Sequence, residues 1–326
     1  MRPLVAATVL AFAFPLGGPA PASGYQLVGG ASFRWPPQLD AVPYWVANRD
    51  DNWMTVEEVV AETRAAADTW GAVAQADVSL SYQGLTNLRP FDFFDRTNTI
   101  GFSTREHLRE LGLSESTLSV TSWLNFVGSG HIGESDILVN PAFNWTDTPE
   151  RGGWDYRSLL VHEIGHFLGL GHSNVGRDTG DGLILGSAVM WPYSFGSMSS
   201  LGRTLTDDDV AGISVLYPGP MRETGVIRGV VRRDGDGVAH AHVTAFEPQA
   251  DHTVGGWADA TGRFEIGGLV PGRYVIRVNP IPDAHPAGAY FFSRQVTDRD
   301  FSVTVLTRLV VVRRDEATEV EIEVRP

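Results

Sequence analysis

A twelve-residue segment, His162 to Ser173, constrains this chain more than any other feature of its sequence. It reads HEIGHFLGLGHS, so two histidines stand four residues apart and a third follows six residues later. Four residues are about one helical turn, which places His162 and His166 on one face, where both imidazoles reach a single cation. Glu163 lies one step further round the helix, and is therefore placed beside the ion without having to bind it.

Gly169 allows the third histidine to join the first two. A helix continued through residue 172 would carry His172 past the site, whereas a glycine adopts positive φ, ends the helix and lets the chain turn back. Three neutral imidazoles then leave a fourth tetrahedral position for water, as in a catalytic zinc site. A chance HExxH pattern on an exposed helix is the alternative, but three of the nine histidines lie within these eleven residues.

Composition narrows the choice of metal ligands and partners. The chain has 326 residues and no cysteine, which excludes disulfides, thiolate nucleophiles and cysteine-based metal sites. The net charge of −14 argues against nucleic acid as a partner. We expect a monomer that takes a protein or peptide substrate.

The N-terminal residues have the order of a secretory signal peptide. Arg2 precedes an apolar run over residues 4–16, and the sequence APA at 20–22 offers a cleavage site between small residues. The run is shorter than the roughly 20 residues that a membrane-spanning helix needs. The sequence predicts a signal peptide over residues 1–22 and a secreted, extracellular protein with no membrane insertion once that peptide is removed.

The remaining sequence divides into two domains near Pro218-Gly219-Pro220. Before this point, mixed strand-like and helix-like segments predict an α+β domain over residues 23–218. After it, short alternating runs separated by glycine and aspartate turns predict an all-β sandwich over residues 221–326. In the first domain, helices are expected from Thr55, over 156–170 and over 206–216, and strands over 42–46, 98–102, 117–126 and 135–139.

The histidine segment resembles the extended zinc signature of the metzincin metallopeptidases. Its sequence is most similar to that of the matrixins, the matrix-metalloprotease branch. The resemblance implies a catalytic domain with a twisted mixed sheet and three helices. It also implies an endopeptidase in which one Zn²⁺ ion activates a water molecule and Glu163 acts as general base. Residues 187–192 are similar to the Met-turn of the family, which implies that Met190 lies beneath the zinc ion; an ordinary core methionine is the alternative.

The same resemblance implies where a substrate would bind. By the order of elements, residues 118–125 would form the edge strand along the cleft, so Leu118 and Val120 are expected to contact an extended peptide. Pro192 resembles the proline of the matrixin wall segment, and Tyr193 stands one position before the place of the usual tyrosine. These four residues are the expected substrate-binding residues.

A Ca²⁺ ion is a further expectation. Residues 178–182 read DTGDG and would supply oxygen ligands, although an exposed glycine-rich turn accounts for the same residues. The cysteine switch and the His-x-Asp pattern of the structural zinc, both known in matrixins, are missing.

Residues 260–274 resemble the carboxypeptidase regulatory-like, transthyretin-like domain, through a Gly-Arg-Phe strand and a Leu-x-Pro-Gly-x-Tyr turn. These residues indicate a fold and not a chemistry. His240, His242 and His252 are expected to face solvent on strands and not to bind metal. The alternative function is a secreted adhesion or surface-binding protein whose sandwich is the working module; the intact Glu163 argues against it.

Overall fold

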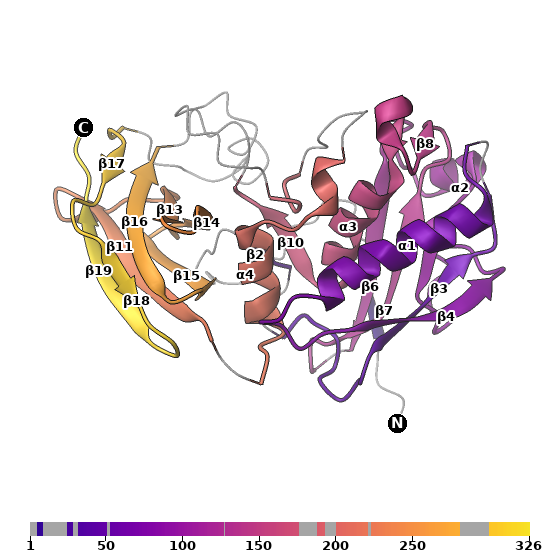
Figure 1. Cartoon of the computed structure of the whole chain (residues 1–326), viewed down its shortest axis with the longest axis horizontal. Coiled ribbons are helices and arrows are strands. Elements are labelled where there is room, and N and C mark those ends of the chain that lie inside the picture. Colours follow the sequence, from indigo (N-terminus) through magenta and orange to yellow (C-terminus); the bar gives the residue numbers. More distant parts are fainter. Residues whose placement is uncertain are drawn as a thin grey trace.

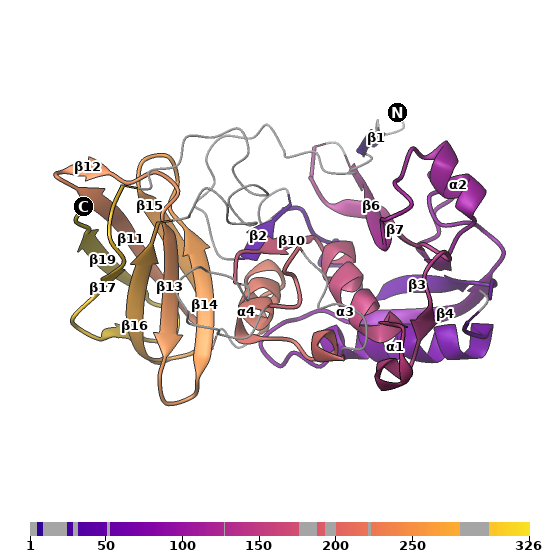
Figure 2. The same ribbon diagram turned by 90° about the horizontal axis from the view of Figure 1, so that it is seen from above.

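The computed structural model describes residues 5–8, 25–28, 32–50, 53–126, 128–175, 188–192, 200–220, 223–280 and 300–326. Two domains lie side by side, the first drawn in indigo through magenta to salmon and the second in orange to yellow (Figure 1). The last helix of the first domain, α4 (Asp207–Leu216), lies between them in both views (Figures 1 and 2). The chain therefore has the α+β and β-rich parts that the sequence predicts.

The first domain is built on a mixed six-stranded sheet. The strands lie in the order β1 (Val5–Thr8), β6 (Ser119–Phe126), β7 (Ile132–Val139), β5 (Thr99–Phe102), β3 (Val42–Ala47) and β4 (Leu80–Thr86). The pairs β7–β5, β5–β3 and β3–β4 are parallel, whereas β1–β6 and β6–β7 are antiparallel.

The predicted edge strand is only partly an edge. Residues 5–8 pair antiparallel with residues 123–126 of β6, and Figure 2 shows β1 beside this strand. The sequence does not predict this pairing, because residues 5–8 fall in the segment that has the order of a signal peptide.

The three predicted helices are present, together with a fourth that was not predicted. α1 (Val56–Gly71) begins at the expected capping box of Thr55 and Glu58, and α3 (Tyr156–Phe167) ends before Gly169, whose φ is 103°. α2 (Arg105–Glu110) has six residues, too few to present a 3.6-residue hydrophobic pattern. The first domain thus contains the three predicted helices and, in addition, this short one.

α1 and α3 pack against each other and cover one face of the sheet. Trp70 of α1 is fully buried, and its Nε1 donates to the carbonyl of Val161 in α3 at 2.7 Å. Arg157 of α3 makes a two-pronged ion pair with Glu62 of α1 at 2.6 and 2.7 Å. Because core contacts hold α3 along its length, this helix is a rigid base for any site that it carries.

Shorter elements complete the first domain. β2 (Tyr25–Leu27) pairs with β10 (Leu170–Ser173), and β8 (Trp145–Thr146) pairs with β9 (Trp154–Asp155). Turns of 3₁₀ helix occur at Pro149–Arg151 and Leu201–Arg203.

The second domain is a sandwich of two sheets. One holds β12 (Asp236–Gly237), β11 (Gly225–Arg233), β15 (Arg263–Leu269) and β19 (Ala317–Glu323); the other holds β14 (His252–Trp257), β13 (His242–Glu247), β16 (Gly272–Asn279), β17 (Thr304–Val305) and β18 (Val310–Val312). Apolar side chains from both sheets form one core, which confirms the predicted sandwich.

One expectation for this domain is wrong. His242 does not face solvent: its side chain is 4% exposed, and its ring lies 4.9 Å from that of Trp257. β14 pairs with β13 and places Trp257 directly opposite His242.

Within the described part of the chain, no helix is both long and apolar enough to cross a membrane.

Candidate metal centre

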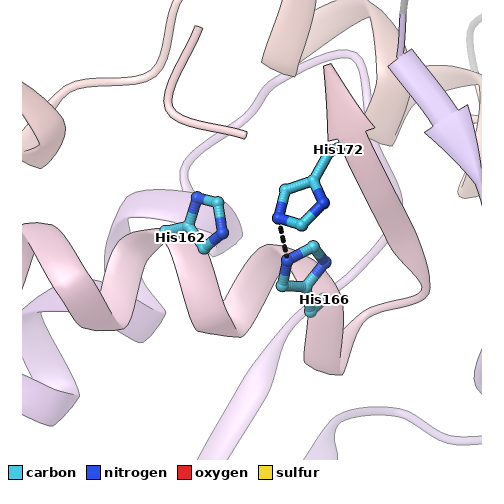
Figure 3. Close-up of side chains that lie close together, drawn as sticks. All are labelled: His162, His166 and His172. Carbon is cyan, nitrogen blue, oxygen red and sulfur yellow. Dashed lines mark hydrogen bonds between the residues drawn. The ribbon is translucent and has the colours of Figure 1, made fainter. Parts of the chain in front are cut away.

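Three histidines from two elements converge at one point. α3 supplies His162 and His166, and β10 returns His172 to them after the turn at Gly169. Figure 3 shows the three rings facing one another, and their potential ligand atoms all lie within 4.8 Å. The two Nε2 atoms of His166 and His172 are 3.1 Å apart. Two nitrogens bound to one tetrahedral zinc ion at 2.0–2.1 Å stand roughly 3.3 Å apart, so the cluster fits zinc.

Backbone carbonyls fix the ring orientation of the two helical histidines. Nδ1 of His162 donates to the carbonyl of Val189, and Nδ1 of His166 to that of Leu170, both at 2.7 Å. A carbonyl only accepts, so each Nδ1 carries the proton and each Nε2 presents a lone pair. This is the usual outer support of a metal-binding histidine.

Burial favours the neutral form of His166 and His172. It lowers the pKa of His166 to about 3, with a further contribution from the neighbouring His162. Burial, followed by His166 and His162, also lowers the pKa of His172 well below its usual range. The neutral form is the one that binds a metal ion, so the site is ready for a cation at neutral pH.

Glu163 is buried beside the histidines. Its side chain accepts a hydrogen bond from Thr121 Oγ1 of β6 at 2.5 Å. Burial raises the pKa of Glu163, while His162 and the hydroxyls of Thr121 and Ser119 oppose the shift. Thr121 was not among the predicted site residues; only the alternation of β6 could have shown that it shares a face with Trp123.

Trp123 ties the same strand to the helix. Its Nε1 donates to the carbonyl of His166 at 2.7 Å, and the two rings meet edge to face. β6 is therefore hydrogen-bonded to α3 at two points, at Glu163 and at the carbonyl of His166.

Met190 packs against α3 at Gly165, the residue before His166. It is 1% exposed, and a Cβ added at Gly165 would overlap its Sδ. Asp209 of α4 holds this turn, because its two carboxylate oxygens accept from the N–H groups of Val189 and Met190 at 2.8 and 3.0 Å. The sequence pattern predicts only a capping box for Asp209, which this residue also forms.

Unlike the three histidines, the predicted substrate-binding residues Leu118 and Val120 do not converge at one point. Leu118 packs against the main core, and Val120 packs on the opposite face of the sheet with Phe91, Leu108 and Leu138. Their role in substrate binding stays a prediction.

The remaining predicted residues follow the Met-turn. Pro192 is partly buried directly after Trp191, whereas Tyr193 and the candidate calcium loop 178–182 lie outside the described residues. The calcium ion stays a prediction.

Comparisons with known proteins agree with this geometry. The matrixin family model matches residues 34–218, and the model of the carboxypeptidase regulatory-like domain matches residues 226–281. Metalloendoproteinase 2-MMP of Arabidopsis thaliana is 30% identical over 190 residues, which are 54% of this chain and 43% of that protein. Matrilysin of Rattus norvegicus is 42% identical over 73 residues, 22% of this chain and 23% of that protein.

The chain spans less than half the length of these two relatives. Among solved structures, a minor pilin of Streptococcus agalactiae matches 33% of this chain and 47% of its own, at 19% identity and a TM-score of 0.21. That score is too low to bear on fold or function.

Proposed function

The chain belongs to the matrixin family, and from this membership we propose that it is a secreted zinc endopeptidase that hydrolyses peptide bonds of extracellular proteins. The observation that carries the proposal is the convergence of His162, His166 and His172 beside the buried Glu163. Three histidines with one carboxylate held next to them are the protein contribution to a catalytic zinc site.

The three histidines would hold the ion through Nε2, supported by the carbonyls of Val189 and Leu170. When bound, zinc supplies a Lewis acid that lowers the pKa of a coordinated water toward about 7.

Glu163 supplies the base. Its carboxylate accepts the proton of the attacking water and passes it to the nitrogen of the departing amine. The hydroxyl of Thr121 holds one carboxylate oxygen, so the side chain keeps its orientation between the two transfers.

The substrate would bind as an extended strand along β6. β7 pairs along one edge of β6; on the other edge, β1 pairs with residues 123–126, and no other described strand pairs with residues 119–122. Removal of the proposed signal peptide, residues 1–22, would take β1 away and open the remaining edge. Backbone hydrogen bonds to such an edge hold a peptide with little dependence on its sequence.

Replacement of Glu163 by glutamine tests the proposed base. Glutamine keeps the size of the side chain and its capacity to accept from Thr121, but it cannot take a proton at neutral pH. We expect Glu163→Gln to bind one zinc ion per chain and to lose roughly 100-fold or more of its casein-cleaving activity. Glu62→Gln is the matched control. It makes the same chemical change at a carboxylate of α1, which pairs with Arg157.

Two further measurements test the metal and the export. A chelator should abolish cleavage, and added zinc should restore it. N-terminal sequencing of the exported protein should begin at Ser23. Wild-type cleavage by Glu163→Gln would overturn the base, and full activity in a metal-free protein would overturn the zinc mechanism.

A further inference from the structure

The second domain is docked onto the elements that carry the metal site. β14 and β15 contact α4, and Figure 1 shows α4 between the sandwich and the rest of the first domain. Tyr25 and Ala211 of the first domain belong to the apolar core of the second. The two domains therefore share buried surface, and the sandwich is not an appendage joined only by a linker.

Asp208 is the polar centre of this contact. It is fully buried, and each carboxylate oxygen accepts a hydrogen bond from a different element. The N–H of Gly255 in β14 donates to Oδ1 at 2.9 Å, and the hydroxyl of Ser173 in β10 donates to Oδ2 at 2.6 Å. One side chain of α4 thus joins the second domain to the strand that carries His172.

Ser173 continues the connection to the site. It directly follows His172, its N–H donates to the carbonyl of Met190 at 2.8 Å, and its hydroxyl accepts from the N–H of Val175 at 2.9 Å. Hydrogen bonds therefore link Gly255 through Asp208 and Ser173 to the carbonyl of Met190, and the peptide bond joins Ser173 to His172.

The contact is also tightly packed. A Cβ added at Gly255 would overlap the side chain of Asn174 and would lie 2.7 Å from Val175 Cγ2. Ordinary contact begins at 3.4 Å, so the strand and the segment after His172 have no room for a methyl group between them. At the rim, His252 lies 3.4 Å from Asp207.

We infer that the second domain is a positioning element of the metal centre, which acts through Asp208 to hold the segment carrying His172 in its ligating position. The inference rests on the zinc site proposed above. α3 fixes His162 and His166 through the core; β10 enters that core at Leu170, and His172 lies two residues further on, in a two-stranded ladder beyond the helix end. Outer support of a metal ligand is commonly worth 10-fold to 100-fold in metal affinity.

The test compares two glycine variants in the full chain. Gly255→Ala places a methyl group against Asn174 and Val175. Gly229→Ala is the matched control, because its methyl group would meet Phe264 at 2.7 Å and the carbonyl of Val320 at 2.5 Å, inside the sandwich. We expect both variants to lose stability, and only Gly255→Ala to raise the zinc dissociation constant, by roughly 10-fold or more.

Two readouts separate positioning from loss of stability. Zinc affinity is measured by competition with a chelator, and amide hydrogen exchange of Ser173 and Val175 is measured in metal-free protein. Gly255→Ala should speed this exchange, and Gly229→Ala should not. Ser173→Ala should also weaken zinc binding, and its effect combined with Gly255→Ala should be less than additive because both variants disturb the same contact of the His172 segment.

Each outcome decides one question. If Gly255→Ala binds zinc like the wild type and its exchange is unchanged, the inference is wrong and the zinc site stands. If the wild type binds no zinc, the proposed function fails, and the exchange measurement alone decides whether the second domain positions the His172 segment. If Gly255→Ala does not fold, Ser173→Ala decides in its place, and unchanged affinity and exchange in that variant overturn the inference.

Discussion

Gly165 stands between the two helical histidines, and its replacement by alanine tests the packing under the metal centre. The added methyl group would overlap Met190 Sδ and would lie 2.8 Å from Trp70 Cζ2, well inside the 3.4 Å of ordinary contact. Trp70 cannot easily yield, because it is fully buried and its Nε1 is bonded to Val161. Overpacking of this kind costs about 1–3 kcal/mol, whereas alanine gains about 1 kcal/mol over glycine in a helix.

Gly71 provides the matched control. It is the last residue of α1, and a Cβ added there meets nothing within 4 Å. Gly71→Ala should therefore keep the gain in helix propensity, up to about 1 kcal/mol, without the overlap. Urea unfolding of metal-free protein should place Gly165→Ala below Gly71→Ala by about 1–3 kcal/mol in free energy of unfolding. Equal stability of the two variants would refute the packing argument.

Two more predictions concern buried polar groups. Trp70→Phe removes the hydrogen bond to Val161 and should cost about 1–3 kcal/mol in urea unfolding, whereas Trp53→Phe, at a side chain 57% exposed, should cost less than about 0.5 kcal/mol. Burial raises the pKa of Asp208 to about 7, and the carboxylates of Asp209 and Asp207 add to the shift. Because the folded state holds this proton more tightly, its contribution to stability is complete below about pH 4 and is lost as the pH rises through about 7. The free energy of unfolding should fall by up to about 4 kcal/mol over this range because of Asp208. The difference in free energy of unfolding between the wild type and Asp208→Asn, measured from about pH 4 to about pH 7, isolates this contribution. If that difference does not change with pH, the raised pKa of Asp208 is contradicted.

The convergence of the three histidines could be predicted from the sequence because its geometry is local. One helical turn separates His162 from His166, and the stop that returns His172 depends on a single residue, Gly169, whose φ of 103° is the one expected. The capping box at Thr55 has the same local origin, so the start of α1 was also predictable.

Contacts between distant segments could not be predicted. The hydroxyl of Thr121 meets Glu163 across 42 positions of sequence, and only the register of β6 against α3 decides which strand residue arrives there. A shift of one residue would turn Thr121 to the other face of the sheet. The prediction for His242 was wrong for a similar reason, since the burial of this residue depends on β14 pairing beside it.

Three successive aspartates show how one motif serves several purposes. Residues 207–209 have the pattern of an acidic first turn of a helix, and Asp209 does form the capping box with Thr206. Asp208 instead points into the domain contact, where Ser173 and Gly255 donate to it. A helix turns about 100° per residue, so neighbouring aspartates necessarily face different elements, and what those elements are depends on the whole fold.

The supports of the three histidines differ in kind, and this sets the order in which the site should fail. His162 and His166 lie on α3, which the main core holds, so they move only when the domain unfolds. β10 enters the main core at Leu170, but Ser173, the residue after His172, is hydrogen-bonded to Asp208 and through it to the second domain. Damage to the sandwich should therefore appear first as weakened metal binding in a first domain that is still folded. Local opening at a weakly held segment precedes global unfolding wherever stability is unevenly distributed.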